Sequence, residues 1–195
     1  MIVVGLTGNL ASGKSQAARI FKKHGARVFD ADLEARKATA KDRPVYRAIV
    51  KIFGKSFLKK DGELHRRKLA RHVFSHPGEL KKLNTLIHPG VIFECIRRAR
   101  ALRGQKGVLV LDVPLLFESG MEGLLDFTVV VRSKKEKIFE RARRRGLSRD
   151  LAEKILSTQW PPRRKARLAD FVVDNNGTVR DLEKKILEVL YKIKK

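Results

Sequence analysis

The sequence predicts an α/β fold in which five parallel strands form one sheet covered by helices. Five short apolar runs are rich in β-branched residues and bounded by Gly, Asp or Asn, as buried parallel strands are. Longer segments with helical spacing separate these runs, and such alternation is typical of βαβ crossovers. We expect strands at residues 2–6, 27–29, 108–113, 127–131 and 171–173.

The predicted helices are unevenly distributed along the chain. They lie at residues 14–24, 33–40, 44–53, 66–74, 79–102, 134–145, 149–158 and 178–193. Two long stretches without a convincing strand interrupt the alternation. We therefore expect a single domain over residues 1–195 with three parts. These are a core (about 1–54, 106–131 and 170–195), a helical insertion (about 55–105) and a helical lid (about 132–169).

The composition describes a folded but very basic protein. The chain has 45 Lys and Arg against 21 Asp and Glu, a net charge of +24, yet 43% of its residues are hydrophobic, unlike a disordered polycation. This charge would attract nucleic acid, an anionic membrane or a polyphosphate ligand. A single cysteine, Cys95, excludes a disulfide framework, and the N-terminus lacks signal-peptide features, so we expect a cytoplasmic protein. The apolar runs are too short to span a membrane.

A phosphate-binding loop is predicted directly after the first strand. Residues Gly8 to Ser15 match the pattern G-x-x-x-x-G-K-[ST] between a strand and a helix. In such a loop the backbone N–H groups surround a nucleotide's β-phosphate, Lys14 bridges the β- and γ-phosphates, and Ser15 offers a hydroxyl to Mg²⁺. The alternative is an ordinary glycine-rich turn. The loop predicts a three-layer core of the P-loop NTPase type, and the chain length disfavours a helicase.

Carboxylates follow the second and third predicted strands. Asp30 and Asp32 close the second strand, and Asp112 lies at the end of the third. Ligands of such sheets bind at the carboxyl ends of the strands. Phosphoryl transfer to a hydroxyl needs a carboxylate that accepts the proton, and one of these residues suits that role. The alternative is that Asp30 or Asp32 caps the helix expected from residue 33.

Taken in order, the motifs resemble the dephospho-CoA kinase family over nearly the whole chain. The phosphate loop alone is generic, whereas the ordered set is specific. The motifs are Gly5-Leu6-Thr7-Gly8 with Ser12-Gly13-Lys14-Ser15, Asp30-Ala31-Asp32 with Arg36, Leu83-Asn84, Ile87-His88-Pro89, Pro114 to Glu118, Arg141, Arg145, Gln159, Ala169-Asp170 and Asp174-Asn175-Asn176-Gly177.

The resemblance implies an ATP-dependent and Mg²⁺-dependent kinase that phosphorylates the ribose 3′-hydroxyl of dephospho-CoA, the last step of coenzyme A synthesis. It implies that Asp32 is the general base and that the helical insertion binds the CoA moiety. The site residues that it implies are, for ATP, Gly8, Asn9, Leu10, Ala11, Ser12, Gly13, Lys14, Ser15, Gln16, Arg141, Arg145 and Asn175 (beside adenine), and for the acceptor, Asp32, Arg36, His88, Leu115 and Glu118.

The loop departs from the family's usual sequence. Asn9, Leu10, Ala11 and Gln16 stand where the family usually has Gly, Ile, Gly and Thr. Asn tolerates positive φ, whereas Ala11 is restricted if its position needs positive φ. We expect these departures to affect the tightness of nucleotide binding rather than the class of protein.

Two rival functions stay open at this stage. One is a P-loop kinase for another nucleoside, nucleotide or small metabolite, and the other is a basic nucleic-acid-binding protein. Only 7% of residues are aromatic and no nucleic-acid-binding motif is present, so we expect no specific nucleic-acid partner and a monomer or weak homo-oligomer. Residues 132–167 contain 14 Lys and Arg against 4 Asp and Glu, which suits a lid over phosphates.

The histidines are open to simpler interpretations. His88 has an alternative as a turn residue before Pro89. The other four, His24, His65, His72 and His76, do not show the spacing of a metal set, so we expect no histidine metal site.

Overall fold

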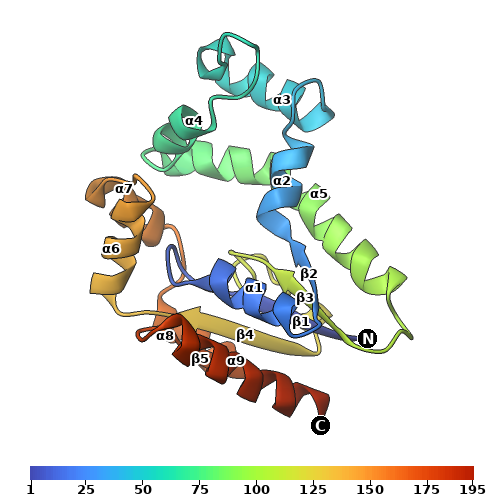
Figure 1. Cartoon of the computed structure of the whole chain (residues 1–195). Coiled ribbons are helices and arrows are strands. Elements are labelled where there is room, and N and C mark those ends of the chain that lie inside the picture. The colour runs from blue at the N-terminus through green and yellow to red at the C-terminus, as the bar shows by residue number, and fades with distance from the viewer. The chain divides into compact units, whose positions relative to one another are not determined.

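The computed structural model describes residues 1–195 and contains one five-stranded parallel sheet (Figure 1). The strands lie in the order β2-β3-β1-β4-β5. All five predicted strands are present, and each ends within one residue of its expected position. They are β1 (Ile2–Thr7), β2 (Arg27–Asp30), β3 (Val108–Asp112), β4 (Phe127–Arg132) and β5 (Phe171–Asp174).

The eight predicted helices are also present, with bounds that differ from the expected ones by at most two residues. They are α1 (Lys14–Lys23), α2 (Ala31–Ala38), α3 (Pro44–Phe53), α4 (Arg66–Val73), α5 (Pro77–Ala101), α6 (Lys135–Arg144), α7 (Arg149–Ser157) and α9 (Val179–Lys194). A further helix, α8 (Pro162–Leu168), and two 3₁₀ turns, η1 (Lys55–Phe57) and η2 (Glu122–Leu124), lie where no helix is predicted. None of these helices is long and apolar enough to cross a membrane.

The chain divides into two compact units. The sheet unit comprises residues 1–30 and 96–195, and the helical unit comprises residues 31–95. The sheet unit carries the phosphate loop and the predicted lid, and the helical unit carries most of the predicted insertion. The functional division into core, insertion and lid stays a prediction.

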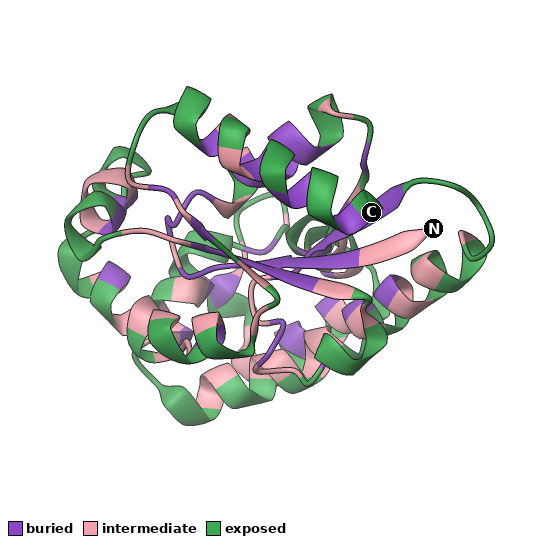
Figure 2. Ribbon diagram, turned by 90° about the horizontal axis from the view of Figure 1, so that it is seen from below, coloured by how far each residue is buried: buried purple, intermediate pink, exposed green.

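The core of the sheet unit lies between the strands and helices α1 and α9. Val4 and Leu6 of β1 and Phe21 of α1 have no exposed surface, and Ile186 of α9 packs into the same cluster. Figure 2 shows this pattern, with buried residues along the strands and exposed residues along the outer helices. From β1 the chain passes to β2 on one side of the sheet, and from β3 it passes to β4 on the other side. The loop after the central strand β1 therefore lies at the switch point, where ligands bind such folds.

The helical unit has its own apolar core. Ile49 of α3, Leu69 and Val73 of α4 and Phe57 of η1 are buried in one cluster. Helix α5 continues through Pro89, so His88 lies inside a helix, and its interpretation as a turn residue is wrong. A proline inside a helix removes one backbone hydrogen bond, which the surrounding packing has to offset.

Candidate active site

The phosphate loop adopts a backbone that only small residues accept easily. Gly13, the residue before α1, has a φ of 101°, and a methyl group added to it would collide with the Asn175 side chain. A methyl group on Gly8 would collide with the carbonyl oxygen of Val131. Gly13 has no side chain that could accept hydrogen bonds from the first N–H groups of α1. The Gln16 N–H donates to the Gly13 carbonyl oxygen at 3.0 Å, whereas the N–H groups of Lys14 and Ser15 precede the first helical hydrogen bond and suit an anion.

Ala11 has a φ of 54°, which lies in the left-handed region. Its position in the loop is therefore one that needs positive φ. Alanine in this region costs about 1–2 kcal/mol. Its methyl group is buried in a small apolar cluster with Ile138, Ala142 and Ala152, and burying a methyl group recovers about 0.8 kcal/mol. The packing therefore offsets only part of the strain, and Ala11 keeps a left-handed backbone at a small net cost.

The carbonyl group of Ser12 is held by side chains from distant parts of the sheet unit. Asn175 donates from Nδ2 to this oxygen at 2.8 Å, and Arg141 donates from Nη1 at 3.1 Å. The Ser133 hydroxyl lies 3.0 Å from the same oxygen. Arg141 also donates to the Asn175 carbonyl oxygen at 3.0 Å, and its burial lowers its pKa. The loop conformation is thus held by residues of α6 and by residues next to α6 and β5.

A second set of contacts joins the loop to the segment before α8. The Asn9 side chain donates to the carbonyl oxygen of Trp160 at 3.0 Å, and the Leu10 N–H donates to Gln159 Oε1 at 2.9 Å. Asn9 is buried, so its amide is satisfied within the protein. Two of the loop residues that depart from the family pattern thus contribute to holding the loop.

Lys14 and Asp112 form a mostly buried ion pair at the carboxyl end of the sheet. Lys14 Nζ contacts Asp112 Oδ1, and the two side chains are 11% and 4% exposed. Asp30 is the register partner of Asp112 across β2 and β3, so two carboxylates end neighbouring strands beside the loop lysine. Ser15 is exposed in the first turn of α1. A hydroxyl and carboxylates are the hard oxygen donors that Mg²⁺ prefers, so these residues fit a nucleotide-bound Mg²⁺.

Gly13 offers a direct test of the loop's backbone requirement. We expect Gly13→Ala to lower the free energy of unfolding by about 2–3 kcal/mol, because positive φ and a collision with Asn175 act together. Gly25→Ala is the matched control: its φ is 86° but nothing lies within 4 Å of the added methyl group. It should cost only about 1 kcal/mol. Equal losses in urea denaturation would show that the Asn175 contact is unimportant.

Glu118 is bound to a fully buried lysine. Lys165 of α8 has no exposed surface, and its Nζ lies 2.8 Å from Glu118 Oε1. The same carboxylate oxygen accepts the Trp160 N–H at 2.9 Å. Lys165 also donates to the Pro114 carbonyl oxygen at 3.3 Å, while the Arg164 guanidinium lies 3.4 Å from the centre of the Trp160 ring. Glu118 therefore holds α8 in place. Leu115, three residues before it in the chain, is half-buried.

We expect Lys165→Met to lower the free energy of unfolding by about 3 kcal/mol, because it leaves Glu118 without the cation of a buried pair. The double variant Lys165→Met/Glu118→Gln should recover much of this loss, since it also removes the charge. The control Lys154→Met breaks an exposed ion pair with Asp150 and should cost less than about 1 kcal/mol. Urea denaturation of the four proteins measures these differences, and equal losses in both single variants would contradict the assignment.

In the helical unit, Asp32 and Arg36 lie exposed on α2. Helix α2 begins at Ala31, so Asp32 is inside its first turn rather than in the capping position, and that interpretation is wrong for Asp32. Arg66 of α4 donates to the Arg36 carbonyl oxygen at 3.0 Å and to the Thr39 hydroxyl at 2.6 Å. Burial, and then the charge of Arg36, lower the pKa of Arg66. Arg66 therefore binds the backbone at the end of α2, and the positive charge of Arg36 acts on its guanidinium group.

His88 is half-buried within α5, and burial lowers its pKa. A lower pKa keeps the imidazole neutral at pH 7, where it can both donate and accept a hydrogen bond. It therefore offers a neutral polar group rather than a positive charge.

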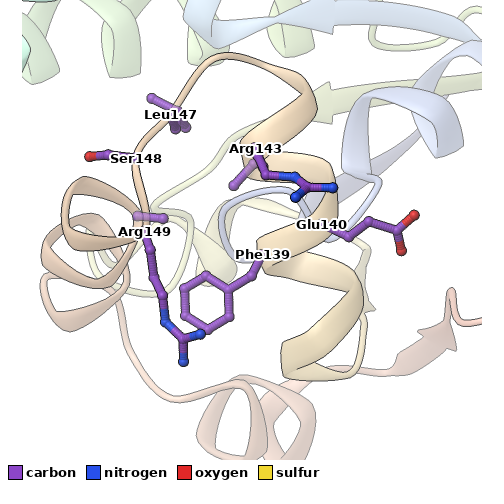
Figure 3. A pocket seen from close by; sticks show the side chains of 8 residues that line it. Phe139, Glu140, Arg143, Leu147, Ser148 and Arg149 are labelled. Atoms are coloured by element: carbon purple, nitrogen blue, oxygen red, sulfur yellow. The ribbon is translucent and has the colours of Figure 1, made fainter.

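The predicted lid contains a cavity of about 450 Å³ between α6 and α7. Figure 3 shows its lining, in which the Arg149 side chain lies along Phe139, with 4.9 Å between the guanidinium carbon and the ring centre. Neither Arg141 nor Arg145 lines this cavity. Arg141 is directed instead to the loop carbonyl groups, and Arg145 is exposed just after α6. Contacts of these two arginines with phosphates, and of Asn175 with adenine, stay predictions.

Three supporting residues are absent from the sequence-based site. Lys165 binds Glu118, Arg66 binds the end of α2, and Ser133 binds the phosphate loop. Lys165 and Arg66 lie in runs of basic residues, Arg163-Arg164-Lys165 and Arg66-Arg67-Lys68, where the sequence does not distinguish a buried cation from solvated ones. Ser133 carries no pattern that would identify it.

Comparisons with known proteins agree with this geometry. A sequence model described as dephospho-CoA kinase matches residues 2–181. The chain is 38% identical over 195 residues to a dephospho-CoA kinase of Carboxydothermus hydrogenoformans, with 98% of this chain and 94% of the relative covered.

Solved structures give the same result. A protein from Thermus thermophilus aligns with a TM-score of 0.78 and 34% identity, covering 98% of this chain and 97% of that one. Dephospho-CoA kinase from Campylobacter jejuni aligns with a TM-score of 0.70 and 26% identity, covering 98% and 96%. The predicted three-layer core of the P-loop NTPase type is confirmed. The sequence and structural matches each cover almost the full length of the chain, and they agree with the phosphate loop. The chain therefore belongs to the dephospho-CoA kinase family.

Proposed function

We propose that this protein transfers the γ-phosphoryl group of ATP to the ribose 3′-hydroxyl of dephospho-CoA, giving coenzyme A and ADP. Membership of the family over residues 2–181 carries the proposal. The loop from Gly8 to Ser15, with Lys14 and Asp112 beside it, supplies the phosphate-binding chemistry that the reaction requires.

ATP binds to the loop residues Gly8 to Gln16 in this proposal. The first N–H groups of α1 and the Lys14 ammonium group neutralise the β- and γ-phosphates. Ser15 and Asp112 would hold Mg²⁺, which neutralises charge on the phosphoryl oxygens. Arg141 contributes by fixing the Ser12 carbonyl group. In this proposal Arg141 and Arg145 belong to the lid over the phosphates, and Arg143 and Arg144 are the alternatives to Arg145. Asn175 lies beside the adenine.

Asp32 is the proposed general base. It accepts the proton of the 3′-hydroxyl as the oxygen forms a bond to the γ-phosphorus. The bond between that phosphorus and the β–γ bridging oxygen breaks, and ADP leaves. Asp32 is an exposed carboxylate in the first turn of α2, so it is accessible for this role.

Most of the proposed acceptor residues belong to the helical unit. Arg36 binds an anionic group of dephospho-CoA, and Arg66 supports it through the end of α2. His88 offers a neutral imidazole for a hydrogen bond. Leu115 and Glu118, which follow β3, complete the acceptor set, with Glu118 held by Lys165.

We further propose a cytoplasmic monomer or weak homo-oligomer with ATP and dephospho-CoA as its small-molecule partners. The single cysteine, Cys95, is a buried free thiol, which suits a reducing compartment. Burial raises its pKa to about 12.

The decisive experiment compares acceptors. ADP release is measured with ATP, Mg²⁺ and one acceptor at a time: dephospho-CoA, nucleosides, nucleoside monophosphates or shikimate. We expect turnover with dephospho-CoA alone, with coenzyme A identified by mass spectrometry. Turnover with another acceptor and none with dephospho-CoA would refute the proposal.

A further inference from the structure

Three potential metal ligands meet at the corner between α4 and α5 in the helical unit. One ligand atom from each of His72, His76 and Glu79 lies within 4.8 Å of the others. His72 is in the last turn of α4, Glu79 is in the first turn of α5, and His76 lies in the turn between them. Positions 72, 76 and 79 have the i, i+4, i+7 spacing of one helical face, and the turn between α4 and α5 keeps the three side chains together. The expectation that the histidines form no metal set considered histidines alone and stays untested.

His76 is already oriented as metal-binding histidines are. Its Nδ1 lies 2.8 Å from the carbonyl oxygen of His72, and only a protonated Nδ1 can donate to that oxygen. A neutral imidazole carries one ring proton, so Nε2 retains its lone pair. A backbone carbonyl that accepts the second ring N–H is the usual support of a metal-bound histidine.

Glu79 directs an oxygen without a hydrogen-bond partner into the same cluster. Its Oε2 is buried, although the side chain as a whole is 39% exposed, and it makes no hydrogen bond of acceptable geometry. The same oxygen lies 2.5 Å from His72 Nε2. This contact pairs the carboxylate with His72, and a metal ion bound by both side chains would replace it beside the buried oxygen.

Aromatic packing holds His72 in place. The ring centre of Phe57 lies 5.0 Å from that of His72, and the two histidine rings are 4.5 Å apart between centres. Phe57 is buried in the core of the helical unit, so this stack ties the cluster to a rigid support. Ligands fixed by packing lose little freedom when an ion binds.

We propose that His72, His76 and Glu79 form a binding site for one divalent transition-metal ion of the zinc class, which joins the end of α4 to the start of α5. Two imidazoles and one carboxylate suit Zn²⁺, Co²⁺ or Ni²⁺, whereas Mg²⁺ prefers oxygen ligands alone. His76 is exposed, so an ion can reach the cluster from solvent. This site is distinct from the oxygen donors beside the phosphate loop, and it does not depend on the proposed kinase activity.

The test is calorimetric titration of the full, tag-free chain with ZnCl₂ after chelator treatment and without nucleotide. We expect one high-affinity ion per chain and no competition from a large excess of Mg²⁺. Glu79→Gln and His76→Gln should each weaken this binding by about tenfold or more. The control His65→Asn removes another histidine of the same unit while keeping a residue that can cap α4, and its Zn²⁺ affinity should equal that of the unmodified protein.

Titration with CoCl₂ provides a second readout. Visible absorption of bound Co²⁺ should appear in the unmodified protein and in His65→Asn, and be lost in Glu79→Gln. Circular dichroism establishes that each variant is folded. The proposal is overturned if the unmodified protein binds no Zn²⁺, or if folded Glu79→Gln and His76→Gln bind it as tightly as the unmodified protein does.

Discussion

Asp32→Asn should lower turnover by about 10²–10⁴-fold, the usual contribution of a general base, while ATP affinity and thermal stability change little. The substitution keeps the size of the side chain, and Asp32 is exposed on α2, so no packing is lost. An amide cannot accept the hydroxyl proton. Turnover should therefore fall at saturating concentrations of both substrates.

The matched control is Glu34→Gln, the same chemical change two residues further along the same helix. Glu34 pairs with Lys37 across one helical turn, an interaction that contributes little to stability. This variant should retain turnover within about threefold of the unmodified protein, less than 1 kcal/mol in barrier height. Turnover is measured as ADP release, and ATP binding by calorimetry. Full activity of Asp32→Asn would remove Asp32 as the base.

Lys14→Met should have two separable effects. Turnover should fall by at least about 10²–10³-fold, because the cation that neutralises the transferring phosphoryl group is lost. The free energy of unfolding should also fall by about 3 kcal/mol, because the substitution removes a cation from the mostly buried Asp112 carboxylate.

A double variant separates these effects. Lys14→Met/Asp112→Asn also removes the negative charge, so much of the lost stability should return while turnover stays at the level of the single variant. Urea denaturation and ADP release on the same samples give the two quantities. Stability that does not recover would show that the ion pair contributes little to the fold, and turnover that does recover would exclude Lys14 from catalysis.

The sheet was predictable because its strands carry their own signal. Buried on both faces, they are continuous apolar runs rich in β-branched residues, such as 108–111. Helix α8 was not predictable, because the Pro161-Pro162 pair indicates a break in the chain. Pro162 instead occupies the first turn of α8, where a missing N–H breaks no hydrogen bond. Its sequence thus contains a start signal that resembles a stop signal.

Site residues with a fixed local spacing were predictable, and those defined by tertiary contacts were not. Lys14 follows from eight consecutive positions, whereas the burial of Lys165 depends on Glu118, which is 47 positions earlier in the chain. The histidine cluster is a different case. His72, His76 and Glu79 have the i, i+4, i+7 spacing of one helical face, but a search among histidines alone leaves out the carboxylate.

The contacts that hold the phosphate loop have a consequence for how the protein is made. The loop is complete once the first 16 residues exist, but its supports come from Arg141, Gln159 and Asn175, which lie 129 to 163 positions later. Contacts of such long range form late, because closing the intervening chain costs entropy before any contact repays it. The ribosome therefore has to synthesise nearly the entire polypeptide before the N-terminal nucleotide loop acquires a fixed shape. At this site the segment that is synthesised first is fixed last.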